Sequence, residues 1–203
     1  MAKESKTKRR VRMILFMALI STLFVTAVSA VHLATRTIIK RNESLFIKKS
    51  VLYTAGLKVP SDPKLLDELF TKTVKHFKGP AGLTHYRVLR DGKTIWVFTQ
   101  SGSGLWGEIK AHIGFTGDLK SIAGIDFIVQ NETPGLGARI AESWFREQFR
   151  GKTGPLTMVP EGTKNEGPRQ FDAITGATVT STAVQSIVNT TLKRADALKG
   201  GVK

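Results

Sequence analysis

The chain has 203 residues, no cysteine and a formal net charge of +15. Without cysteine, the chain cannot itself form disulfides, thiolate metal sites, iron–sulfur ligation or cysteine nucleophiles, so redox chemistry needs a bound organic cofactor or a partner. The length allows one domain of about 150 residues beside a membrane segment. Part of the basic excess lies within the first 12 positions and the rest is scattered, which argues against a nucleic-acid partner.

The first predicted element is a transmembrane helix over residues 13–34, preceded by a basic cytoplasmic tail over residues 1–12. The run from Met13 to Ala34 contains no Asp, Glu, Lys or Arg, and 22 residues at about 1.5 Å each span the ~30 Å hydrocarbon layer. The basic tail favours a cytoplasmic N-terminus. A signal peptide cleaved after Val28-Ser29-Ala30 is the alternative, but the apolar run exceeds the ~7–15 residues of such a leader.

A helical connector is predicted over residues 35–79. Apolar pairs recur every seven residues from Ile38 onward with basic residues between them, so an amphipathic helix continues out of the membrane and ends near Gly56. Ser61-Asp62-Pro63 caps a second helix. The predicted apolar side of this second helix consists of Leu65, Leu66, Leu69, Phe70 and Val74.

The predicted cofactor domain over residues 80–203 begins with four antiparallel strands. Asp91-Gly92 marks the turn of the first hairpin, and Thr116-Gly117-Asp118 marks the second. The fold class is therefore α+β, with a twisted antiparallel sheet and flanking helices behind a single N-terminal transmembrane helix. The predicted elements are strands at 85–90, 94–100, 108–115 and 120–129, a helix at 138–149, an irregular segment at 151–170 and a helix at 180–198.

The segment Ser101-Gly-Ser-Gly-Leu-Trp-Gly107 contains a formal G-x-G-x-x-G. A dinucleotide fold needs a helix after this motif, but residues 108–115 alternate like a strand, so we reject that interpretation. The glycines instead let the backbone approach a flat ligand. A glycine-rich hairpin loop with a core tryptophan is the alternative.

The segment Glu132-Thr-Pro-Gly-Leu-Gly137 ends a strand and opens a helix. Gly135 and Gly137 permit turn dihedrals, and the Thr133 hydroxyl can donate to a ligand oxygen. By itself the segment predicts only a turn.

The segment Asp172-Ala-Ile-Thr-Gly-Ala-Thr178 precedes a helix predicted to start near Thr180. The free N–H groups and positive dipole end of that helix would point at the segment and could seat a phosphate. An ordinary hydroxyl-capped helix after a glycine turn is the alternative.

Together, these three segments resemble those of a family of flavoproteins. Asp172–Thr178 is similar to D-x-x-[S/T]-G-A-T, on which a flavin transferase joins FMN through its phosphate to the last threonine. Residues 132–137 resemble the family's E-T-P-G-L-G loop, and Gly104-Leu-Trp-Gly107 resembles its G-L-W segment. The three segments also follow a single N-terminal membrane helix in the same order as in that family. The resemblance is to the C subunit of the sodium-translocating NADH:quinone oxidoreductase (Nqr), and next to the G subunit of the Rnf complex.

The resemblance implies that FMN is the cofactor, joined covalently to Thr178, and that a flavin transferase reads Asp172, Gly176 and Ala177. Thr175 places a second hydroxyl three residues away and is the alternative attachment site. No metal and no catalytic residue are expected. The implied contacts with the flavin are Leu105, Trp106, Thr133, Leu136, Gly137, Thr175, Gly176 and Ala177. Lys164, which matches none of these motifs, is a further candidate for a flavin contact.

The implied function is that of a membrane-anchored electron carrier, not catalytic alone, within an ion-translocating NADH:quinone oxidoreductase. Its partners would be the other membrane subunits, and its FMN domain would lie on the periplasmic or extracellular side of the cytoplasmic membrane. An Rnf-type carrier between ferredoxin and NAD is the alternative within this class. A non-redox binding module, secreted or membrane-anchored, is the alternative from another class.

Overall fold

The structure is a computed structural model that describes residues 6–78, 84–163 and 167–198. Its contacts divide the chain into two compact units, Met1–Ser44 and Leu45–Lys203. In the first unit, residues 6–44 are helical. The second contains the sheet, and it includes the last ten residues of α1 (Lys6–Thr54) as well as α2 (Pro63–Thr73).

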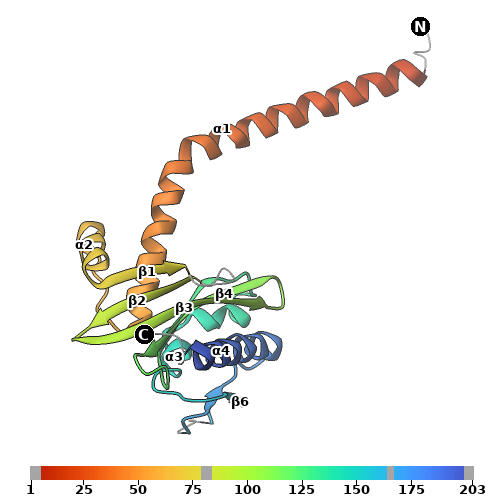
Figure 1. Cartoon of the computed structure of the whole chain (residues 1–203). Coiled ribbons are helices and arrows are strands. Elements are labelled where there is room, and N and C mark those ends of the chain that lie inside the picture. The colour runs from red at the N-terminus through yellow and green to blue at the C-terminus, as the bar shows by residue number, and fades with distance from the viewer. Residues whose placement is uncertain (1–5, 79–83, 164–166, 199–203) are drawn as a thin grey trace. The chain divides into compact units, whose positions relative to one another are not determined.

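The second unit is organised around a five-stranded antiparallel sheet in which each strand pairs with the next along the chain (Figure 1). This confirms the predicted α+β class. Both predicted hairpins form. Asp91 and Gly92 both have positive φ, at 48° and 73°, as a two-residue hairpin turn requires. The strands are β1 (Val74–Lys78), β2 (Thr84–Arg90), β3 (Lys93–Ser103), β4 (Glu108–Thr116) and β5 (Ile122–Val129).

Helices cover the two faces of this sheet. On one face, Val51 and Ala55 near the end of α1 pack with Phe70 of α2 against Val88 and Val97. On the other face, α4 (Thr178–Leu198) packs over β3 and β4 through the larger core cluster. Figure 1 shows α2 and α4 on opposite sides of the sheet. The continuous burial of residues 111–115 in the central strand β4 fits a sheet that is packed on both faces.

The strand β1 corrects the predicted connector. Val74 lies in this strand, paired with Val88, and not on the apolar side of the second helix. The helix α2 ends one residue earlier, and its Leu65 is 56% exposed. The predicted cap of this helix is confirmed, because the Asp62 carboxylate accepts the N–H groups of Lys64 and Leu65. The sheet therefore has five strands where four were predicted.

Two further predictions of secondary structure were wrong. The single helix expected at 138–149 is broken at Glu142, whose ψ of 149° is extended, into a 3₁₀ helix η2 (Gly137–Ala141) and the short α3 (Ser143–Glu147). The segment 151–170 is not wholly irregular, because β6 (Thr157–Val159) pairs in parallel with β7 (Gln170–Asp172). Neither short strand carries enough alternation to be recognised from the sequence.

The helix α1 contains the apolar run predicted to cross a membrane. Its most apolar window has a mean hydropathy of 2.4 and none of it is buried within the chain. Large apolar side chains such as Phe16, Leu23 and Val31 are 61–64% exposed. In the described part of the chain, this is the one helix long and apolar enough to span a bilayer.

Candidate functional site

A cleft of about 260 Å³ forms where the start of α4 meets the loop after β3 and the segment after β5. This volume is slightly below the ~300–1,000 Å³ of sites that enclose a small molecule. A ligand as large as a flavin nucleotide would therefore extend beyond the cleft over its rim. The cleft is lined by Leu105, Glu132, Thr133, Leu136, Gly137, Gly176, Ala177, Thr178, Val179 and Thr180.

Glu132 connects the three segments that form the cleft. Its residue is only 5% exposed. One carboxylate oxygen, Oε1, accepts the backbone N–H groups of Leu105 at 3.0 Å and Trp106 at 3.1 Å. The other, Oε2, accepts the hydroxyl of Thr180 at 2.5 Å. The carboxylate therefore ties the β3–β4 loop to the first turn of α4, with charge-assisted hydrogen bonds of the stronger kind.

Two glycines leave room for this carboxylate. A Cβ atom on Gly104 would lie 2.5 Å from Glu132 Oε1, and a Cβ on Gly137 would lie 2.5 Å from Thr180 Oγ1 and 2.8 Å from Glu132 Oε2. Gly137 does not have a positive φ, so it is needed because it leaves space for the carboxylate. Gly135, in contrast, has the φ of 75° that a turn requires. Both close approaches are ones that a side chain would block.

Trp106 stands at the rim of the cleft. Its indole N–H donates to Thr133 Oγ1 at 3.0 Å, and its residue is 68% exposed. The Thr133 oxygen therefore accepts from the indole in this structure. An exposed aromatic ring held by a hydrogen bond offers a flat surface against which another ring can pack.

The start of α4 is fixed by the chain just before it. The Ala177 N–H donates to Ile174 O, the Ile174 N–H donates to Ser181 Oγ, and the first helical bond runs from Ser181 N–H to Ala177 O, each at 3.0 Å. Gly176 supplies the φ of 77° that the turn requires. The helix begins at Thr178, two residues before the predicted start, so the last threonine of the motif belongs to its first turn.

This first turn is what could hold an anion in the cleft. Helix geometry leaves the N–H groups of Thr178, Val179 and Thr180 without an intrahelical acceptor, and all three residues line the cleft. The helix start also carries a partial positive charge. The arrangement suits a phosphate group. Thr178 itself is exposed, so its hydroxyl is accessible next to these N–H groups.

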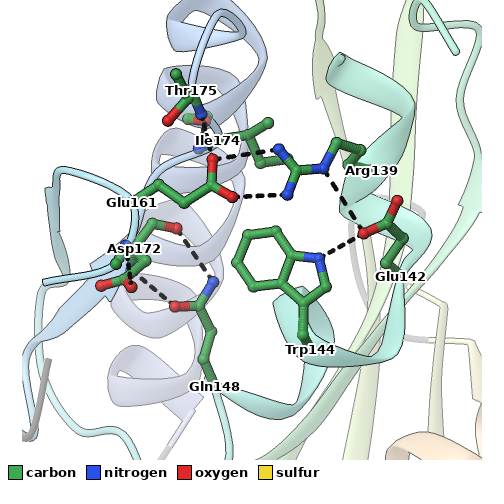
Figure 2. A network of polar contacts seen from close by, with 10 residues as sticks. Arg139, Glu142, Trp144, Gln148, Glu161, Asp172, Ile174 and Thr175 are labelled. Atoms are coloured by element: carbon green, nitrogen blue, oxygen red, sulfur yellow. Dashed lines mark hydrogen bonds and ion pairs between the residues drawn. The ribbon is translucent and has the colours of Figure 1, made fainter. Parts of the chain in front are cut away.

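Thr175 has different surroundings (Figure 2). Its backbone N–H donates to Glu161 Oε2 at 2.7 Å, and Arg139 holds the same carboxylate with its two terminal nitrogens at 2.6 and 3.2 Å. The hydrogen bonds from Arg139, and after it from the backbone and side chain of Thr175, lower the pKa of Glu161 to about 2. Thr175 is therefore held by Glu161 and does not line the cleft.

Asp172 also lies outside the cleft, at the end of β7. Its backbone N–H and carbonyl pair with the Gln148 amide at 2.7 and 3.2 Å (Figure 2). Its carboxylate accepts the N–H of Gly162 at 2.9 Å. Asp172 thus joins β7 to the preceding loop, and Lys164 in that loop lies outside the described residues.

The cleft therefore brings together six of the eight predicted flavin contacts, along with Thr178. Trp106 is at its rim and Thr175 is turned to Glu161. The sequence reasoning missed Glu132, although it quoted the motif that contains it, and it missed Arg139 and Glu161 altogether. A signal for Glu132 existed, because an acid at the end of an apolar strand and beside a glycine-rich turn needs several donors when buried.

With this geometry in view, the segment that forms the cleft can be related to a known family of domains. Residues 104–193 match the family described as FMN-binding domain. The match begins at the glycine-rich loop and includes the cleft and the threonine motif. The matched segment is thus similar to a family of domains described as FMN-binding.

The relatives belong to ion-translocating complexes. The chain is 40% identical over 106 residues to the G subunit of the Na(+)-translocating ferredoxin:NAD(+) oxidoreductase complex of Acetobacterium woodii, covering 51% of this chain and 50% of the relative. It is 30% identical over 148 residues to the C subunit of the Na(+)-translocating NADH-quinone reductase of Pseudomonas aeruginosa, covering 66% and 56%. The chain thus spans about half the length of the curated relatives it matches.

Solved structures confirm the fold. The C subunit of the Na(+)-translocating NADH-quinone reductase from Parabacteroides distasonis superposes with a TM-score of 0.69 at 23% identity, over 83% of this chain and 98% of that one. The NqrC of Shewanella oneidensis gives 0.66 at 20% identity, over 79% and 99%. The chain has the NqrC-like fold, and its homologues include both kinds of protein that its motifs resemble.

Proposed function

We propose that this protein is a membrane-anchored electron carrier whose FMN is joined through its phosphate to Thr178. One observation carries the proposal. Thr178 is the first residue of α4 and lines the cleft, where the N–H groups of the first helical turn have no intrahelical acceptor. A phosphate esterified to its hydroxyl would therefore lie beside a site suited to phosphate.

The residues around the cleft divide into two groups. Thr178, Val179 and Thr180 would hold the phosphate end, and Leu105, Trp106 and Leu136 would border the ring, since all three present 43–68% of their surface. When bound, FMN supplies one- and two-electron redox chemistry that the side chains lack. The chain contributes binding, orientation and the buried charge of Glu132.

Attachment needs a separate enzyme. A threonine hydroxyl is a weak nucleophile without a base, and each described histidine lies outside the residues that line the cleft. The hydroxyl oxygen would bond to phosphorus and lose its proton, while an activated FMN donor loses its leaving group. A flavin transferase would supply that donor and read Asp172, Gly176 and Ala177.

The apolar stretch of α1 would anchor the carrier in the cytoplasmic membrane, with the basic residues 8–12 on the cytoplasmic side and the FMN domain on the other. The proposed assembly is an Nqr-type NADH:quinone oxidoreductase, with its other membrane subunits as partners. The 40% identity to the G subunit of a ferredoxin:NAD(+) oxidoreductase favours an Rnf-type assembly as the second candidate.

The test is co-expression of the full chain with a flavin transferase, followed by in-gel flavin fluorescence after denaturation. We expect fluorescence in the wild type and in Thr175→Ala, and none in Thr178→Ala, because Thr178 lines the cleft and Thr175 does not. Circular dichroism of each variant shows whether the domain is folded. Fluorescence that persists in a folded Thr178→Ala would refute the assignment.

A further inference from the structure

The two faces of the sheet are covered unequally at β1 and β2. On the face toward α1 and α2, Val88 of β2 is fully buried. On the face toward α4, the helix packs over β3 and β4. There Phe77 of β1 is 39% exposed and Leu89 of β2 is 54% exposed. The outer part of this second face is therefore left accessible to solvent.

Strand register identifies the residues on this outer surface. Phe77 pairs with His85, which pairs with Phe98, and Arg87 pairs with Trp96. Directly paired residues of antiparallel strands present their side chains on the same face. We call the surface made by Lys75, Phe77, His85, Arg87, Leu89 and Trp96 the β1–β2 face.

The aromatic side chains of this face are already ordered against one another. The rings of Phe77 and His85 stack at 5.5 Å with only 8° between their planes. Trp96 lies 6.4 Å from Phe77 and 6.0 Å from His85, and the Arg87 guanidinium sits 5.8 Å from the Phe77 centroid. Side chains that are ordered before binding lose little conformational entropy when a partner covers them.

The charged residues around the face are mainly basic. Between Val74 and Ser103 the sequence has a clear excess of basic residues and a single acid, Asp91. Lys75 and Arg87 are exposed on the face itself, and Lys93 is exposed at its end. A partner that covers this surface must bring carboxylates, because burying unpaired cations is costly.

We propose that the β1–β2 face docks an acidic, partly apolar segment of a partner protein. Arg, Trp and Phe are the residues that dominate the cores of protein interfaces, and here they form one surface with a basic rim. A nucleic acid or an anionic lipid would also contact the cations, and the crosslinking experiment distinguishes both from a protein partner.

This docking surface goes beyond the proposed electron-carrier function. Along β3 the face extends from Trp96 to the level of Phe98, with which His85 pairs, whereas the cleft follows the far end of β3 at Ser103. Five residues of extended strand, from Phe98 to Ser103, separate them, about 17 Å at ~3.3 Å per residue. The residues of the β1–β2 face do not line the cleft, so a partner on this face leaves the cleft accessible, and its proposed role is to place the domain.

The test is site-specific photocrosslinking of the full chain in its native membranes, with the photoreactive residue in place of Leu89. The control carries it in place of Leu65, which is 56% exposed on α2. We expect several-fold more protein adduct from position 89, with the crosslinked peptide rich in Asp and Glu. Arg87→Glu should abolish this adduct, whereas Lys64→Glu on α2 should not.

A reciprocal exchange then confirms the charge pairing. Changing the acids of the mapped partner peptide to Lys should restore crosslinking to the Arg87→Glu chain. The inference is overturned if positions 89 and 65 give equal adducts. It is also overturned if the adduct is a second copy of this chain, a lipid or a nuclease-sensitive species, or if the mapped peptide has no acidic residues. None of these outcomes depends on whether flavin is attached, so the docking surface and the carrier function can fail separately.

Discussion

The carboxylate of Glu132 is predicted to hold the cleft together, and Glu132→Ala measures how much it contributes. The change leaves three donors without their acceptor: the N–H groups of Leu105 and Trp106 and the hydroxyl of Thr180. A buried donor left unsatisfied costs about 1–3 kcal/mol. Two of the three lie in an exposed loop that water can reach, so we expect a total loss of about 2–4 kcal/mol.

The assay is urea unfolding of the full chain in detergent, followed by circular dichroism of the sheet domain. Glu132→Gln should lose less stability than Glu132→Ala, because the amide oxygen can still accept the two loop N–H groups while its NH₂ faces Thr180. Glu108→Ala is the matched control, since that acid is exposed and makes only a 3.5 Å ion pair with Lys110. If Glu132→Ala unfolds at the same urea concentration as Glu108→Ala, the carboxylate does not hold the cleft together.

Three further predictions concern the sheet domain. Burial lowers the pKa of His112 to about 4. Because the unfolded chain binds a proton at this histidine more readily than the folded domain, the free energy of unfolding should be highest above about pH 6.5 and fall by roughly 3 kcal/mol as the pH drops to about 4. The urea midpoint should therefore fall with pH in the wild type and change less in His112→Gln. A wild-type midpoint that stays constant over this range would contradict the reasoning. Gly137→Ala should cost about 1–3 kcal/mol by crowding Thr180, whereas Gly107→Ala, whose nearest neighbour is 3.6 Å away, should be tolerated in the same thermal unfolding experiment; equal melting temperatures would argue against the crowding. Asp62→Ala removes the α2 cap and should cost about 1 kcal/mol, and a loss below the error of the urea midpoints would show that the cap is dispensable.

The sequence predicted the elements whose signals are local. Asp91 and Gly92 readily adopt the positive φ of a two-residue hairpin turn, so the two residues alone predict the hairpin. Asp62 before Pro63 predicts a helix start, because a cap bonds only to the first turn of its own helix. The strand β1 could not be predicted in this way. Its five residues are stabilised by pairing with β2 and by the packing of Val74 against the core, and these tertiary contacts cannot be recognised from a local pattern.

The same distinction applies to the cleft. Each motif was visible by itself, but their meeting depends on Glu132, which accepts donors 26 and 27 residues before it and 48 residues after it. The break at Glu142 and the Arg139–Glu161 pair likewise depend on packing between distant segments. The different surroundings of Thr175 and Thr178 follow from these contacts and could not be read from their shared chemistry.

The central claim is that Thr178 carries the FMN, and peptide mass spectrometry of the co-expressed full chain tests it most directly. The proteolytic peptide that contains residues 172–178 should carry the mass of FMN less one water. Fragmentation should place that mass on Thr178 and leave Thr175, which Glu161 holds, unmodified. A peptide modified at Thr175, or a transferase-treated chain with no flavin on any residue, would contradict the account.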